Sequence, residues 1–65
     1  MDRLGLLCRN IYENNKMTQR ELAAAMDLSL GTCNHLVKDG LAQELFTFDP
    51  AEGTYSLLKG GVDLL

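Results

Sequence analysis

The 65-residue chain has no tryptophan and only two phenylalanines, two tyrosines and one proline. With so few aromatic side chains, a core must be built mostly from Leu, Ala, Met, Val and Ile. Hydrophobic residues nevertheless make up 46% of the chain, a share that is normal for folded proteins and argues against disorder. A chain of this length forms one domain at most, and its stability is marginal because it buries only about 60% of its unfolded surface.

Metal ligands, nucleophile motifs and long apolar runs are also scarce. One histidine and two distant cysteines lack the ligand spacing of a zinc site, so no cofactor is expected. There is no Gly-rich phosphate loop and no nucleophile elbow, which argues against an enzyme. No apolar run approaches the roughly 18 residues that span a membrane, and the N-terminus lacks the pattern of a signal peptide. The sequence therefore predicts a cytoplasmic protein with no membrane partner.

The two cysteines, Cys8 and Cys33, fall at apolar positions of predicted helices. This placement favours reduced thiols packed in the core, as expected in the cytoplasm. The sequence does not decide whether the two cysteines form a disulfide, because two cysteines define no disulfide framework.

Positive charge is in short supply. Six Lys and Arg stand against nine Asp and Glu, which gives a net charge of −3. This balance counts against purely electrostatic binding to nucleic acid, for which a basic face is the usual signature. Any basic stripe would have to be built from Arg3, Arg9, Lys16, Arg20, Lys38 and Lys59.

Residues 18–41, TQRELAAAMDLSLGTCNHLVKDGL, organise the chain as two short helices joined by a tight turn. The first is predicted over 19–26. Thr18 and Glu21 have the spacing of a capping box, in which each side chain bonds the other residue's amide. The helix then presents a narrow face of small and apolar side chains, which lets a neighbour pack close: Leu22, Ala23, Ala25 and Met26.

The turn, 27–29, carries its own signals. Asp27 stands where such a turn needs a left-handed residue, a conformation that Asp adopts readily. Leu28 is expected to fill the core, and Ser29 is a good N-cap for a second helix over 30–39. Gly40 is expected to end that helix as a C-terminal cap. Its inward side is predicted to consist of Cys33, Leu36 and Val37.

The flanking segments complete a mainly α fold with a small β-hairpin. A helix over about 2–14, capped by Asp2, has an apolar stripe of Leu4, Leu7, Cys8, Ile11 and Tyr12. Strands over 41–48 and 54–58 enclose a turn at 49–53, marked by Pro and Gly. Lys59-Gly60-Gly61 is expected to break the second strand, and residues 62–65 to start another helix. A single domain over 1–65 follows from this order: helix 1 about 2–14, helix-turn-helix about 18–40, hairpin about 41–58.

The apolar and small positions of the helix-turn-helix, together with the segments that follow, resemble a known family. These positions are Leu22, Ala23, Met26, Leu28, Cys33, Leu36 and Val37. Residues 38–41, KDGL, are similar to the segment in which the second helix ends, a Gly and an aliphatic residue follow, and the first strand of the β-hairpin, called the wing, begins. Residues 55–61, YSLLKGG, are similar to the "Tyr-x-Leu-Thr-x-x-Gly" end of the second strand, with Leu58 where Thr is usual. The chain thus resembles bacterial winged helix-turn-helix regulators, MarR-like or related.

The resemblance implies DNA binding with helix 3, about Leu30–Asp39, in the major groove. Asn34 could pair with adenine, which presents a donor and an acceptor side by side. Lys38 would neutralise a phosphate, Gly31 would allow close backbone approach, and His35 lies on the same polar face. Ser29 and Thr32 could bond phosphates at the positive N-terminus of the helix.

Each of these side chains also has a plainer interpretation. Ser29 is first of all a helix cap, and Asn34 and His35 could simply be solvated. Arg20, in the first turn of the preceding helix, could anchor the DNA backbone or pair with Glu13 or Glu21.

Two departures from the family pattern bear on function. The tip of the wing carries Asp49 and Glu52 without any Lys or Arg, so no wing contact with phosphates is expected. Helix 3 carries only Lys38 as a cation, beside Asp39. Binding should therefore need a homodimer or an attached C-terminal domain.

Two alternatives stay open at this point. The chain could be the N-terminal regulatory module of a larger protein, since similar winged helices stand ahead of nucleotidyltransferase and kinase domains. It could also be a protein-interaction winged helix, whose contact would use Leu30, Phe46, Phe48, Leu64 and Leu65.

Overall fold

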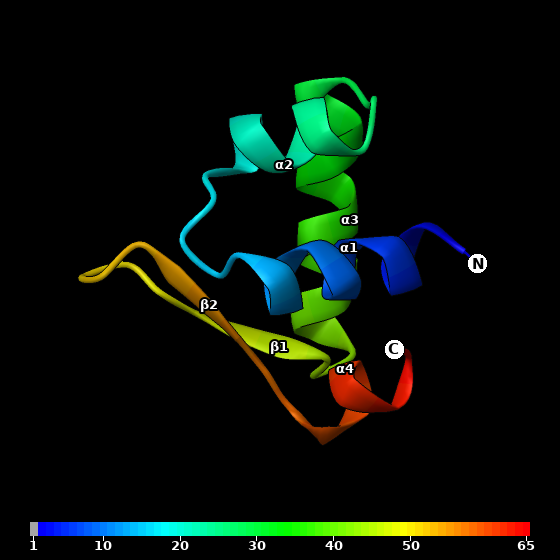
Figure 1. Cartoon of the computed structure of the whole chain (residues 1–65), viewed down its shortest axis with the longest axis vertical. Coiled ribbons are helices and arrows are strands. Elements are labelled where there is room, and N and C mark those ends of the chain that lie inside the picture. The colour runs from blue at the N-terminus through cyan, green and yellow to red at the C-terminus, as the bar shows by residue number, and fades with distance from the viewer. Residues whose placement is uncertain (1) are drawn as a thin grey trace.

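The computed structural model describes residues 2–65. The elements are α1 (Arg3–Glu13), α2 (Gln19–Ala25), α3 (Leu30–Ala42), β1 (Phe46–Asp49), β2 (Thr54–Leu57) and α4 (Lys59–Asp63). Helix α3 forms the long axis, α1 crosses it, α2 packs at one end, and the hairpin and α4 lie at the other end (Figure 1). The predicted class, a mainly α winged helix-turn-helix with a small hairpin, is confirmed.

Each of the three main helices begins at the cap that the sequence predicts. The Asp2 carboxylate accepts the Gly5 amide at 2.7 Å. The capping box of α2 is complete: the Glu21 amide donates to Thr18 Oγ1 at 3.1 Å, and the Thr18 amide donates to Glu21 Oε1 at 2.9 Å. Ser29 caps α3, and Asp27 is left-handed at φ 56°.

Replacing Thr18 with alanine is expected to cost about 0.5–2 kcal/mol of stability, because the exposed amides at the start of α2 lose their acceptor. Urea unfolding followed by circular dichroism measures the change. Thr18→Ser, which keeps the hydroxyl, is the matched control. An alanine variant as stable as the serine variant would contradict the proposed role of the cap.

The core lies between α1, α3 and the base of the hairpin, with α2 closing one end. Its buried members are Leu7, Cys8, Ile11, Leu22, Ala23, Cys33, Val37, Leu45, Phe46 and Tyr55. The rings of Phe46 and Tyr55 meet edge to face, with centroids 5.8 Å apart. Although aromatic residues are few, two of the four therefore form the centre of the core.

Both cysteines are buried free thiols, as the sequence predicts. Burial raises the pKa of the Cys33 thiol, and burial together with the negative charge of Asp2 raises the pKa of the Cys8 thiol. Neutral, packed thiols of this kind behave as small apolar side chains.

Three side chains assigned to packing faces lie elsewhere. Tyr12 is 70% exposed, because it stands one position beyond Ile11, at the edge of the α1 stripe that faces the core. Leu28 is half-buried and outside the core cluster; its amide instead closes the turn by donating to the Ala23 carbonyl at 2.8 Å. Ala25 is exposed at the end of α2.

The prediction that Gly40 ends the second helix of the helix-turn-helix is wrong. Helix α3 continues to Ala42, and Gly40 lies buried inside it. A Cβ at this position would overlap the ring of Phe46, so glycine is needed for close approach and not for a left-handed cap. The left-handed residue is Glu44, at φ 58°, four positions later.

The first wing strand therefore starts later than predicted, at Phe46 and not at residue 41. Residues 41 and 42 finish the helix, and the Leu45 amide donates to the Gly40 carbonyl at 2.9 Å to close it. The two strands pair antiparallel, with Phe46 opposite Leu57 and Asp49 opposite Thr54. The predicted turn between them is present, with Gly53 at φ 67°.

Residues 59–61 do interrupt the second strand, but they do so by starting helix α4. Helix α4 packs against α1 and β2, and Gly61 lies against the backbone of Leu45. Over residues 2–65, no helix is both long enough and apolar enough to cross a membrane.

Candidate nucleic-acid interface

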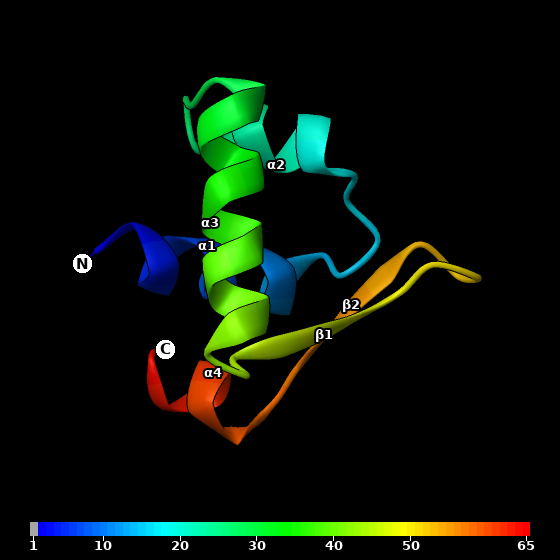
Figure 2. The same cartoon turned by 180° about the vertical axis from the view of Figure 1, so that it is seen from behind.

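Helix α3 has one side in the core and one side free. Cys33, Val37 and Gly40 are buried against the rest of the domain. Three exposed residues, Gly31, His35 and Lys38, follow one another at four- and three-residue spacing and so share the outward side. Figure 2 shows α3 in front of α1. The structure thus brings together three of the predicted site residues on one exposed stripe.

Asn34 lies at the border of this stripe, toward α2, and is half-buried. Its Nδ2 donates a hydrogen bond to Gln19 Oε1 at 3.0 Å. Asn34 is therefore held by a neighbour and is not simply solvated. Gln19, the first residue of α2, is a site residue that the sequence analysis missed. No local pattern indicates it, since the two residues are 15 positions apart and meet only through helix packing.

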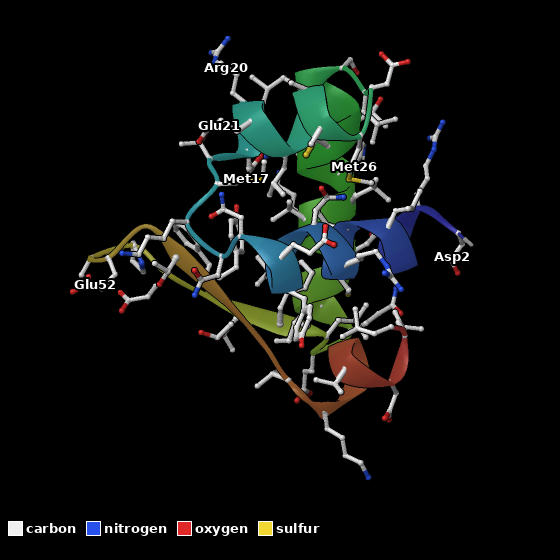
Figure 3. All side chains as sticks on the ribbon, in the orientation of Figure 1. Asp2, Met17, Arg20, Glu21, Met26 and Glu52 are labelled. Atoms are coloured by element: carbon white, nitrogen blue, oxygen red, sulfur yellow. The ribbon has the colours of Figure 1, made fainter. Side chains whose placement is uncertain are left out.

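Arg20 stands beside this pair. An open hollow between α2 and α3 is lined by Gln19, Arg20, Leu30, Gly31 and Asn34. Arg20 is exposed, and its side chain extends away from the body of the molecule (Figure 3). Glu21, one of its proposed partners, turns to the Thr18 amide instead. Arg20 thus adds a cation to the edge of the hollow.

Ser29 and Thr32 are engaged with each other. The Ser29 hydroxyl donates to Thr32 Oγ1 at 2.9 Å, and the Thr32 amide donates to Ser29 Oγ at 3.1 Å. Ser29 is therefore a helix cap, in accordance with its plainer interpretation. Thr32 is half-buried and does not line the hollow. The structure separates this hydroxyl pair from the group formed by Gly31, Asn34 and Arg20.

Gln19 also connects the hollow with the wing. Burial raises the pKa of the Tyr55 phenol, a side-chain hydrogen bond with Gln19 lowers it, and the nearby Cys33 raises it. Gln19 thus lies between Asn34 of α3, from which its Oε1 accepts a hydrogen bond, and Tyr55 of β2, whose pKa it lowers.

The wing carries acidic side chains away from α3. Asp49 ends β1, and the Asp49 Oδ1 atom accepts the Ala51 amide at 2.9 Å within the turn. Glu52 is exposed at the tip of the hairpin (Figure 3). The wing tip therefore carries Asp49 and Glu52, while Arg20 lies on α2 and Lys38 on α3.

Comparison with known proteins places these features in a context. A family model described as winged helix-turn-helix DNA-binding matches residues 4–39, from α1 through most of α3. A comparison with curated protein sequences finds no match. The match thus covers the helices that form the hollow and the exposed stripe.

Two solved structures are similar to the whole chain. The crystal structure of ScaR with bound Zn²⁺ has 29% sequence identity and a TM-score of 0.83, and the alignment covers 97% of this chain and 30% of ScaR. The crystal structure of the MepR–DNA complex from S. aureus has 18% identity and a TM-score of 0.72, with 98% and 50% covered. The chain thus spans half or less of each of these proteins.

Over residues 2–65, no group of three or more His, Cys, Asp or Glu side chains is placed to hold a metal ion.

Proposed function

Because the chain belongs to the winged helix-turn-helix DNA-binding family, we propose that it binds double-stranded DNA in transcription regulation by inserting α3 into the major groove. The sequence resembles MarR-like or related winged helix-turn-helix regulators, and the match to the winged helix-turn-helix family and the similarity to ScaR support this resemblance. The observation that carries the proposal is the outward side of α3, where exposed polar residues and Gly31 stand opposite the core. An α-helix about 10–12 Å wide fits a major groove about 12 Å wide.

The proposed roles follow from where each side chain lies. Asn34 faces the hollow and would read an adenine edge, and Gly31 would admit the DNA close to the helix. Lys38 and Arg20 would contact phosphates on the two sides of α3, and His35 would lie against the groove wall. Ser29 and Thr32 would offer the N-terminal end of α3 to a phosphate, with Ser29 keeping its role as cap.

Two cations near α3 and an acidic wing tip leave little charge to hold DNA. We infer that one copy binds weakly, and that a second copy or an attached C-terminal domain supplies the remaining contacts. A dimer reading two half-sites one helical turn apart would meet this need.

Charge removal tests the proposed orientation. Arg20→Ala and Lys38→Ala should each weaken binding to all duplexes about equally, and each should reduce the slope of log K against log salt by about 1. Fluorescence anisotropy with a labelled pool of randomised duplexes, at several salt concentrations, measures both quantities. Lys59→Ala is the matched control, because this exposed cation begins α4, at the end of the molecule away from α2 (Figure 1).

The control should leave the salt slope unchanged. Equal losses in all three variants would mean that overall charge, and not the α3 side, governs binding. Absence of binding to any duplex at low salt would overturn the proposed function.

The exposed apolar side chains favour a second candidate, a protein-interaction surface. Leu30, Phe48, Leu64 and Leu65 are between 37% and 43% exposed. Phe46, also expected at such a contact, is 1% exposed and cannot take part. A domain that binds no duplex yet sediments as a stable oligomer would favour this candidate.

A further inference from the structure

We propose that Gln19 is a positioning residue that fixes the Asn34 side-chain amide in the orientation that reads adenine. The inference rests on the proposed function, and it assigns base specificity at one position of the site to a residue outside α3. It stands on the contacts that Gln19 makes with three other residues.

The direct contact is the hydrogen bond from Asn34 Nδ2 to Gln19 Oε1, 3.0 Å long and partly buried. An asparagine amide has two N–H groups and one oxygen. When Gln19 accepts one N–H, the other N–H and the oxygen Oδ1 remain free. These two groups are the donor and acceptor that pair with N7 and the N6 amino group of adenine.

Rotation of the amide by 180° would exchange its oxygen and nitrogen. Without Gln19 the two orientations compete, and the flipped one offers an acceptor toward N7 and a donor toward the amino group. With Gln19 in place, the flipped orientation would set two oxygens against each other, because Gln19 presents Oε1 and not a donor. The bond therefore selects one orientation of Asn34 before DNA binds.

Gln19 itself is held from two further sides. Its main-chain carbonyl accepts from the Cys33 thiol at 3.5 Å, one residue before Asn34, so the start of α2 is attached to α3. Its side chain lies beside Tyr55, which is only 2% exposed and packs against Phe46 and Phe48. The Gln19 atom that meets Asn34 is the acceptor Oε1.

The test compares Gln19→Met, similar in length but without an amide, with Gln19→Glu, which keeps an acceptor for Asn34. Selection from a randomised duplex pool first gives the preferred site. The Asn34→Ala variant identifies the base pair of this site that Asn34 reads, because the preference for that base pair is lost in the variant. Four duplexes that differ only at that base pair then serve as the probe. The wild-type chain should prefer A·T there by about 5- to 150-fold.

Gln19→Met should reduce this preference by about threefold or more, as expected when an ordered hydrogen bond is lost. It should change binding to unrelated duplexes much less. Gln19→Glu should retain the preference, since its added charge weakens all four duplexes alike and cancels in the ratio. On the Asn34→Ala background, Gln19→Met should have no further effect on the ratio.

A second readout does not involve DNA. In nuclear magnetic resonance spectra of the free chain, the Asn34 side-chain amide signals should move toward those of a solvated amide in Gln19→Met and remain shifted in Gln19→Glu. A Gln19→Met variant with unchanged Asn34 signals and an unchanged preference would overturn the inference while leaving DNA binding intact. If no duplex binds at all, the proposed function fails, and base reading fails with it.

Discussion

Replacing Gly40 with alanine is expected to lower the free energy of unfolding by about 1–3 kcal/mol, the usual cost of overpacking a core. The new methyl group would overlap the ring of Phe46, which is 1% exposed and packed edge to face on Tyr55. The ring therefore cannot move aside without disturbing the core. For a chain of 65 residues, whose total stability is on the order of 3–10 kcal/mol, this loss is large. Urea unfolding and the melting temperature both measure it.

The same substitution at Gly31 is the matched control, because it lies in the same helix. A Cβ at Gly31 meets nothing within 4 Å, so Gly31→Ala should stabilise the chain by about 0.5–1 kcal/mol through helix propensity. Replacing glycine with alanine is thus expected to lower the free energy of unfolding at Gly40 and to raise it at Gly31, although both residues lie in α3. Adding Phe46→Leu to Gly40→Ala should recover part of the loss, since it removes the atoms that clash. A Gly40→Ala variant as stable as the wild-type chain would contradict the close approach of α3 and the wing.

Gly61→Ala is the second substitution with a large expected effect, also about 1–3 kcal/mol. Here the added methyl group would meet the Leu45 carbonyl oxygen, and Leu57 Cδ2 at 3.0 Å. The carbonyl cannot retreat freely, because it accepts the Leu58 amide at 2.9 Å. Either α4 leaves the base of the wing or that hydrogen bond breaks. Thermal unfolding measures the loss, and faster hydrogen exchange at the Leu58 amide would show which contact gives way.

Gly60→Ala provides the comparison for α4. Its Cβ would lie 3.3 Å from Leu45 Cδ2, a side-chain methyl group that can shift by a few tenths of an ångström. The gain in helix propensity offsets this contact, and a net change within about 0.5 kcal/mol is expected. Equal losses at Gly60 and Gly61 would mean that glycine is needed in α4 for flexibility and not for contact with Leu45.

The candidate site could be predicted only in part from the sequence. The sequence predicts Asn34, His35 and Lys38 because polar residues at helical spacing point to one face. That pattern does not show what else a side chain contacts. The Ser29 cap follows from local sequence, but only the structure shows that Asn34 is bonded to Gln19. The sequence does not indicate Gln19, because no local pattern relates the first residue of one helix to the middle of the next.

Local patterns give the wrong role for residues of two kinds. The apolar spacing of α1 places Tyr12 in the core, although it is exposed. The glycine pattern makes Gly40 a helix stop, and it places Gly60 and Gly61 before the last helix, although they lie inside α4. Glycine is favoured wherever the backbone must turn and also wherever a neighbour must come close, and the sequence does not separate these two reasons. At Gly40 and Gly61 the neighbour is Phe46 or Leu45, and each lies close only in the folded chain.

The sequence by itself determined the starts of the three main helices, α1, α2 and α3, and the class of the fold. The capping box of Thr18 and Glu21, the Ser29 cap and the left-handed Asp27 depend on residues within a few positions of one another. Their hydrogen bonds are available to the chain before it packs. Tertiary structure decided where α3 ends, where the wing begins, and which partner holds Asn34. These features arise from contacts between residues distant in the sequence, where packing against a particular neighbour overrides local preference.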